Sequence, residues 1–235
     1  MDPRTPVFIV CSPLPHVGKT LIARLLAEYL QADERPFAAF DVNPDDFALA
    51  QQLPDHTTIA HIDDTKGQMA LFDQLIIADV TSKVIDVGYR CFDRFFNVLQ
   101  DIDFNTAAHR ALIAPVLMFI AEPDDRSVQA YAALGERFPE LPLVPVFNTG
   151  AGTDVRARDS FRSKYVTIPL QIPFLAPALK TTLARSGLPT PANDRQPGAS
   201  SSDLQAWMRR VFLQFRELEL RLLLEELKPS LRLRA

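Results

Sequence analysis

The sequence predicts an α/β fold, in which a mostly parallel sheet lies between layers of helices, followed by a long C-terminal helix. Short apolar, β-branched runs alternate with segments of helical periodicity, a pattern typical of parallel strands joined by crossover helices. The C-terminal segment is instead leucine-rich, with apolar residues recurring every three or four positions. At 235 residues the chain is long enough for one such domain with a full core.

The elements follow in order along the chain. Strands are expected at about 7–11, 37–42, 83–88, 114–121, 143–148 and 165–170. Helices are expected at about 19–31, 67–80, 91–100, 125–138 and 175–186.

The segment 67–80 is ambiguous, because its last residues, LIIADV, could form a strand that ends at Asp79. A helix is preferred, because 83–88 is the better strand and several apolar residues of 67–80 fall at helical spacing, namely Met69, Phe72, Ile76 and Val80.

The composition of 189–202, PTPANDRQPGASSS, is typical of a linker. It divides the chain into a domain at 1–188 and a C-terminal amphipathic helix at 203–235, which is expected to be helical over about 203–227. A heptad-like stripe runs along this helix, formed by Leu204, Met208, Val211, Phe215, Leu218 and Leu222. A second apolar flank is formed by Trp207, Phe212, Leu220, Leu223, Leu224 and Leu227. A helix with this much apolar surface must pack against the core, a partner subunit, another protein or a membrane surface.

Bulk composition is that of a soluble globular protein, with 47% hydrophobic and 23% charged residues. A net charge of −4 gives no overall attraction to nucleic acid; the basic segment 154–164 is the one candidate patch, and it is more typical of a solvated loop. Two cysteines indicate a reducing cytosol, and no run is long enough to span a membrane. We therefore expect a cytoplasmic protein.

The stretch CSPLPHVGKT, residues 11–20, joins the first strand to the first helix. A phosphate-binding loop needs backbone N–H groups at a helix start, a lysine for the β- and γ-phosphates and a hydroxyl for Mg²⁺. Gly18, Lys19 and Thr20 provide these groups in the right strand–turn–helix context. The expected fold is therefore the P-loop NTPase type of three-layer sandwich.

Further matches follow in order. Asp41 ends the second strand, 22 residues after Lys19, in the segment AFDVNPDD. Here the sequence resembles the ParA/MinD group of P-loop ATPases, in which a strand ending D-x-D follows the loop at this distance. KVIDVG resembles the group's switch strand, and VPVFN its strand ending in asparagine. MFIAEPDDRSVQAYAALG and YVTIPLQIP also match, so the resemblance covers about 7–175.

The resemblance implies ATP and Mg²⁺ as cofactors. It gives Lys19 a catalytic role on the β- and γ-phosphates, Thr20 a direct metal contact, and Asp41 and Asp86 places in the metal's water shell. Asp79 is the alternative to Asp86 if 67–80 contains a strand. The remaining nucleotide contacts are expected along the loop and at the adenine edge, from Pro15, His16, Val17, Gly18, Lys19, Thr20, Leu21 and Asn148.

The departures from the family pattern are also specific. Leu14 stands where the group has a signature lysine that reaches the partner subunit's phosphates in a dimer. Asn43 stands at the catalytic position where the group has the second aspartate of D-x-D, and an amide cannot accept a proton from the attacking water. Pro13 and Pro15 each remove an N–H from the loop, and His16 could donate to a phosphate in place of the lost lysine.

The sequence thus predicts an ATP-binding switch protein with weak or absent hydrolysis, which controls dimerisation or a protein partner through its C-terminal helix. PLPHVGKT also resembles the loop of dethiobiotin synthetase, a carboxylate-activating enzyme of the same superfamily. A pseudo-ATPase scaffold is the third interpretation.

Overall fold

The structure is a computed structural model, and it describes residues 4–44, 46–148, 159–162, 169–179, 183 and 199–232, with side chains of the last segment described over 202–227. Several expectations fall outside these ranges. They are the linker at 189–198, most of the basic segment 154–164, strand residues 165–168 and most of the helix at 175–186.

The centre of the molecule is a seven-stranded sheet of order β3-β2-β4-β1-β5-β6-β7, in which every described pair of strands is parallel. Its strands are β1 (Thr5–Cys11), β2 (Phe37–Val42), β3 (Thr57–Ile59), β4 (Ser82–Val87), β5 (Ile113–Ile120), β6 (Leu143–Asn148) and β7 (Leu170–Ile172). The connection after β1 leads to β2 on one side of it, and the connection after β4 crosses to β5 on the other side, so the carboxyl end of β1 lies where the strand order reverses. Open α/β sheets bind their ligands at such a position.

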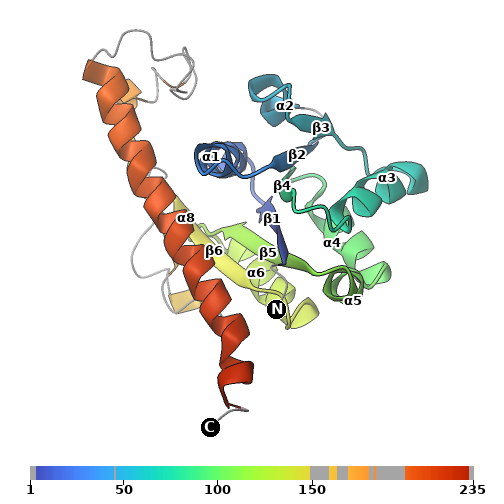
Figure 1. Cartoon of the computed structure of the whole chain (residues 1–235). Helices are drawn as coiled ribbons and strands as arrows, with labels where there is room; N and C mark the ends of the chain where they lie inside the picture. The colour runs from blue at the N-terminus through green and yellow to red at the C-terminus, as the bar shows by residue number, and fades with distance from the viewer. Residues whose placement is uncertain are drawn as a thin grey trace.

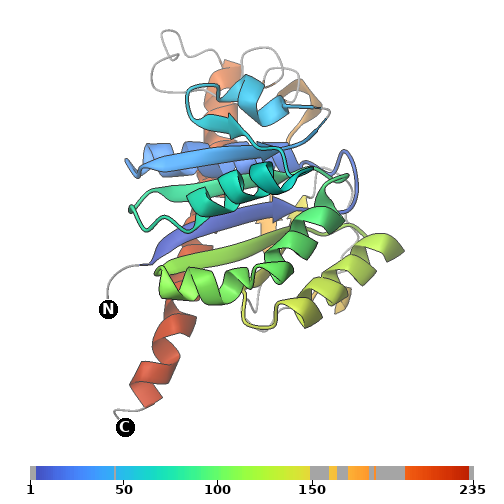
Figure 2. The same cartoon turned by 90° about the vertical axis from the view of Figure 1, so that its right-hand side faces the viewer.

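Helices cover both faces of the sheet, which gives three layers (Figures 1 and 2). One face carries α1 (Lys19–Ala32) and the long α8 (Ala199–Arg232). The other face carries α3 (Thr65–Leu75), α4 (Phe92–Asp101), α5 (Phe104–Arg110) and α6 (Asp125–Arg137). The short α2 (Ala48–Gln52) follows β2 at the edge. The predicted three-layer α/β fold with a parallel sheet and a long C-terminal helix is confirmed, whereas α2, β3 and α5 were not predicted.

Two hydrophobic cores lie on the two faces of the sheet, because successive side chains of a strand point to opposite sides. In β1, Val7, Ile9 and Cys11 join the core under α3, α4 and α5, while Phe8 and Val10 join the core under α1 and α8. Each fully buried side chain of this size contributes about 1.5–3 kcal/mol. The alternation holds β1, and the loop that follows it, rigidly at the centre.

The predicted helix in 67–80 is confirmed, but its periodicity was extended too far. Helix α3 begins after Asp64, whose carboxylate accepts from the Gly67 amide at 2.7 Å, and it ends at Leu75. The exposed fractions of Met69 (59%) and Val80 (76%) exclude both from the core. Residues 76–81 form a connection to β4, with Val80 at a φ of 58°.

The long C-terminal helix begins at Ala199, within the segment expected as a linker. Its heptad-like stripe packs in cis. Leu204, Met208, Val211, Phe215 and Leu218 are all buried in the core under α1, and Leu222 is half-buried against it. Trp207 is also buried, and its indole N–H donates to the Pro173 carbonyl at 2.8 Å. Of the alternatives open at the sequence level, this stripe covers the chain's own core.

Candidate functional site

The loop after β1 is bent so that its lysine folds back over it. His16 and Gly18 both have positive φ, at 58° and 97°, and the second ends the loop as the N-cap of α1. The Lys19 ammonium donates to the Leu14 carbonyl at 2.6 Å. Because the first N–H groups of a helix have no intrahelical acceptor, the amides at the start of α1 are available to an anion beside this ammonium.

Gly18 is required by both conformation and space. At a φ of 97° a side chain is strained, and an added Cβ would lie 2.6 Å from the Asn148 amide nitrogen. Asn148 ends β6, and its side-chain amide donates to the Val17 carbonyl at 3.1 Å. The asparagine predicted at the adenine edge therefore lies against the loop.

Two carboxylates meet the loop at the carboxyl edge of the sheet. Asp41 of β2 and Asp86 of β4 are paired in register, and both are fully buried. The Thr20 hydroxyl donates to Asp86 Oδ2 at 2.6 Å. Asp41 is held by α2, whose Leu49 and Ala50 amides donate to Oδ2 at 3.0 and 3.1 Å. Residues far apart in sequence thus form one cluster.

Asn43 lies between these carboxylates. Its amide nitrogen donates to Asp41 Oδ1 at 2.9 Å and to Asp86 Oδ2 at a longer 3.5 Å. The amide oxygen faces the Gly88 backbone, where an added Cβ would lie 2.2 Å away. The side chain is therefore fixed as a donor to the acidic pair, which a carboxylate at this position could not be.

Burial controls the ionisation of the cluster. It raises the pKa of Asp86 to about 7, an effect that the Thr20 hydrogen bond opposes and the neighbouring Asp41 reinforces. Burial also raises the pKa of Asp41, against the hydrogen bonds from Asn43, Ala50 and Leu49. The pKa of Lys19 is lowered by burial, while the Asp86 carboxylate counteracts that change. Such opposed effects are typical of binding sites.

The cluster fits a Mg²⁺ ion bound together with phosphate. Within the described residues, Asp86 Oδ1 is buried and has no hydrogen-bond partner. The Thr20 hydroxyl donates its proton to Asp86, which leaves its oxygen lone pairs for a cation. No group of three or more His, Cys, Asp or Glu in that part of the chain could hold a metal by itself. Mg²⁺ ordinarily uses one or two carboxylates and completes its shell with water and substrate phosphates.

The other predicted site residues lie at the periphery of this cluster. Pro15 and His16 are exposed at the tip of the loop. The Val17 side chain is buried, and the partly buried Leu21 packs on the core under α1 and α8.

Tyr89 was missed by the sequence analysis. It follows Gly88 directly after β4, and its ring centroid lies 5.9 Å from the Lys19 ammonium nitrogen. An aromatic face at that distance attracts the cation. The signal was the aromatic residue immediately after the glycine of KVIDVG.

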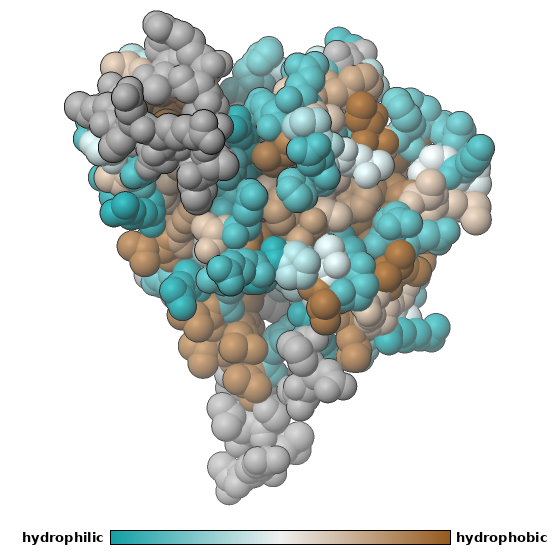
Figure 3. Space-filling view, turned by 45° about the horizontal axis from the view of Figure 1, so that its top comes forward, coloured by the Kyte–Doolittle hydropathy of each residue, from teal (hydrophilic) through white to brown (hydrophobic). Residues whose placement is uncertain are grey.

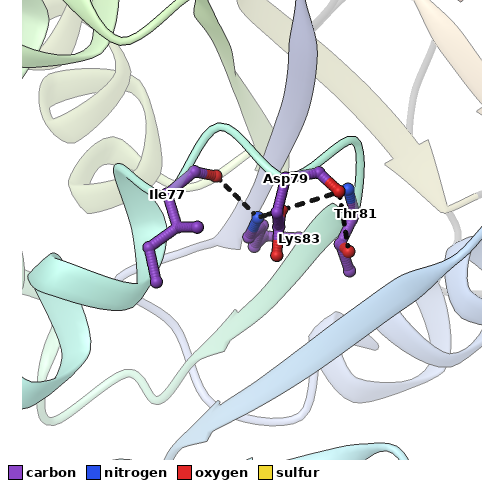
Figure 4. Close-up of polar contacts among 4 residues, drawn as sticks. All are labelled: Ile77, Asp79, Thr81 and Lys83. Carbon is purple, nitrogen blue, oxygen red and sulfur yellow. Dashed lines mark hydrogen bonds and ion pairs between the residues drawn. The ribbon is translucent and has the colours of Figure 1, made fainter.

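Asp79, the alternative to Asp86, lies at the opposite end of β4 (Figure 4). It is bonded to the Lys83 ammonium and accepts from the Thr81 amide at 3.1 Å. The same ammonium donates to the Ile77 carbonyl at 3.0 Å. These contacts hold the connection to β4 at the amino edge of the sheet, away from the cluster.

No protein-family model matches the chain, and no curated protein matches it in sequence. Among solved structures, the chain is similar to one described as the crystal structure of a ParA family ATPase from Chlorobium tepidum TLS. The sequence identity is 14%, the TM-score is 0.47, and the match covers 88% of this chain and 98% of that chain. Because the sequence identity and the TM-score are both this low, the function proposed below rests on the geometry of the site and not on this similarity.

Proposed function

We propose that this chain is a divergent ParA/MinD-like switch protein that binds ATP with Mg²⁺ and hydrolyses it weakly or not at all. One observation carries the proposal: Lys19 and Thr20 at the start of α1 lie beside Asp41 and Asp86 at the carboxyl edge of a parallel sheet. This is the set of groups that a nucleoside triphosphate with Mg²⁺ requires.

Each group has a distinct part in binding. Lys19 exchanges the Leu14 carbonyl for the β- and γ-phosphate oxygens, and the α1 amides donate to the same phosphates. Thr20 would hold the metal directly, and Asp41 and Asp86 would hold its water shell. When bound, Mg²⁺ supplies positive charge that neutralises the phosphates.

Asn43 supports weak hydrolysis. A general base must accept a proton from the attacking water. The Asn43 amide has no such capacity and is already engaged with Asp41. Nucleotide would therefore stay bound for long periods, which suits a switch that controls dimerisation or a protein partner in the cytoplasm.

Thermal denaturation tests binding. We expect ATP with Mg²⁺, at about 100 times its Kd, to stabilise the wild type by about 2.7 kcal/mol, which is an increase in Tm of several degrees. Lys19→Ala should abolish this increase, and EDTA should reduce it in the wild type. Lys66→Ala, which removes an exposed lysine of α3, is the matched control and should keep the full increase.

The Tm of each variant without nucleotide shows whether it is folded. If the wild type gains no stability from ATP with Mg²⁺, the protein is not a nucleotide-binding switch, and the pseudo-ATPase interpretation replaces this proposal. An unchanged increase in Lys19→Ala would show that nucleotide binds elsewhere.

A further inference from the structure

Glu122 carries a carboxylate oxygen to which the described part of the chain offers no donor. Its Oε1 is buried and has no hydrogen-bond partner there. Burial raises the pKa of Glu122, and none of the described cations lies near enough to oppose that change. A buried acceptor without a donor costs free energy, and such a group in a native structure points to a missing ligand or water.

The helix that follows Glu122 does not use its carboxylate. Helix α6 has its own N-cap in Asp124, which accepts from the Arg126 and Ser127 amides at 2.9 and 3.3 Å. The backbone of Glu122 is held separately, because its amide donates to the hydroxyl of the buried Ser127 at 3.3 Å. The backbone at this position is therefore fixed by a bond of its own, whereas Oε1 has none.

Glu122 lies at the carboxyl edge of the sheet, one strand away from the loop after β1. Strands β1, β5 and β6 are neighbours in that order (Figure 1). The register pairs Ile120 of β5 with Val146 of β6, and the Ala121 amide still donates to the Val146 carbonyl at 2.9 Å. Continued by two residues, this pairing places Glu122 beside Asn148, whose amide contacts the loop.

A nucleotide bound at the loop has one open direction along this edge. On the side of β4 and β2 the edge is occupied by the acidic pair Asp86 and Asp41. On the other side it carries Glu122 and Asn148, and Phe174, which is 58% exposed, follows β7. An exposed aromatic ring is a surface on which a base stacks. The sugar and the base therefore extend from the loop toward β5, β6 and β7.

The ribose of such a nucleotide reaches Glu122. It follows directly on the phosphates, and neighbouring strands lie about 4.8 Å apart, so phosphates held over β1 put the sugar over the end of β5. Its 2′- and 3′-hydroxyls are two adjacent donors, which suit the two oxygens of one carboxylate. The Glu122 side chain is partly exposed and its terminal torsion is broad, so Oε1 can turn outward to meet them. Carboxylates accept from ribose hydroxyls in this way in other α/β folds.

We propose that Glu122 accepts hydrogen bonds from the 2′- and 3′-hydroxyls of the ribose and thereby selects ribonucleotides. This inference rests on the proposed function, because the loop and Lys19 must first hold the phosphates. Glu122 recognises a part of the ligand that the phosphate and metal groups do not contact. Its role is to bind the sugar, and it takes no part in proton transfer.

Titration calorimetry with three probes tests the proposal: ATP, 2′,3′-dideoxy-ATP and inorganic tripolyphosphate, each with Mg²⁺. The wild type should bind ATP at least about 10-fold more tightly than the dideoxy nucleotide, because the acceptor is charged. Glu122→Ala should remove this difference by weakening ATP alone, and Glu122→Gln, which keeps one carbonyl acceptor, should lose part of it. Glu136→Ala, which removes an exposed glutamate of α6, is the matched control and should bind all three probes as the wild type does.

The two proposals fail in different ways. If neither ATP nor tripolyphosphate binds the wild type, the phosphate site is absent and both proposals are overturned. If both probes bind but the wild type does not distinguish ATP from the dideoxy nucleotide, the role of Glu122 alone is overturned. The same conclusion follows if Glu122→Ala weakens all three probes equally, as a structural defect would, or weakens none. The Tm of each variant without ligand shows that it is folded.

Discussion

Asn43 joins the two buried carboxylates of the site with one amide group. If Asn43→Asp replaces this donor, a third carboxylate lies where the amide stood 2.9 Å from Asp41 Oδ1. Loss of the hydrogen bond and the added repulsion should destabilise the protein by about 1–3 kcal/mol in EDTA. Mg²⁺ with ATP should restore that stability.

The same variant should hydrolyse ATP faster than the wild type, because the new carboxylate can accept a proton from water. Phosphate release and Tm with and without Mg²⁺ measure the two effects. Gln74→Glu, an exposed change of the same charge on α3, is the control. An unchanged rate of hydrolysis in Asn43→Asp, in a protein whose Tm is restored by Mg²⁺ with ATP, would contradict the assignment of this position as limiting.

Asp86 makes stability depend on pH. Because burial raises its pKa from an ordinary value near 3.8 to about 7, the folded state holds a proton there that the unfolded state has released. Its contribution is fully present below pH 3.8 and is lost as pH rises toward 7. At about 1.4 kcal/mol for each tenfold change in proton affinity, the loss amounts to at most about 4 kcal/mol.

Urea denaturation without nucleotide, at pH 5 and pH 8, should therefore show a larger loss of stability in the wild type than in Asp86→Asn, which has no proton to release. Equal losses in the two proteins would show that Asp86 is ionised throughout this range.

At the scale of elements, α8 is a structural part of the domain. It packs on α1, the helix that follows the loop after β1, through Phe215 and Tyr29, whose ring centroids lie 5.7 Å apart. The Tyr29 hydroxyl donates to Glu219 at 2.7 Å, and Arg35 donates to the same carboxylate. Removing residues 199–235 would expose this core, so point substitutions are needed to study the helix.

The two sides of α8 should respond differently to truncation of a side chain. Phe215→Ala leaves a cavity in the core under α1 and should cost about 3–5 kcal/mol. Leu213→Ala, two residues earlier on the exposed face, should change the stability by about 0.5 kcal/mol or less. Urea denaturation of both variants measures the two costs. If the two substitutions cost a similar amount of stability, α8 does not pack with Phe215 in the core and Leu213 exposed.

For the whole molecule, the two ends of the parallel sheet carry different residues. Asp41 and Asp86 lie at the carboxyl ends of β2 and β4, beside Lys19 at the start of α1, and the amino ends of β1 and β5 line a groove under α8. None of the described helices is long and apolar enough to cross a membrane. The last turns of α8 project past the sheet (Figures 1 and 2), and within the described residues Glu226 pairs with Arg4 ahead of β1 at 3.7 Å.

The sequence by itself determined the fold class, the positions of the main strands along the chain and the loop that joins β1 to α1. These follow from local periodicity and from motif spacing, which are properties of neighbouring residues. The helix at 67–80 was predicted, but its end was not, because nothing local to Ile76 shows that the chain turns toward β4. The short α2 and α5 carry too few residues for periodicity to be recognised.

Only the tertiary structure decided which side chains meet. It places the Asn43 amide between Asp41 and Asp86, the Tyr89 ring near Lys19, and Asp79 at the opposite edge from the site. It also assigns the heptad-like stripe of α8 to the core and leaves the outer leucines of the same helix exposed (Figure 3), namely Leu213, Leu220, Leu223 and Leu224. A periodic pattern reveals that a helix has apolar faces. Which face is buried depends on contacts with residues far away in the sequence, and these exist once the chain has folded.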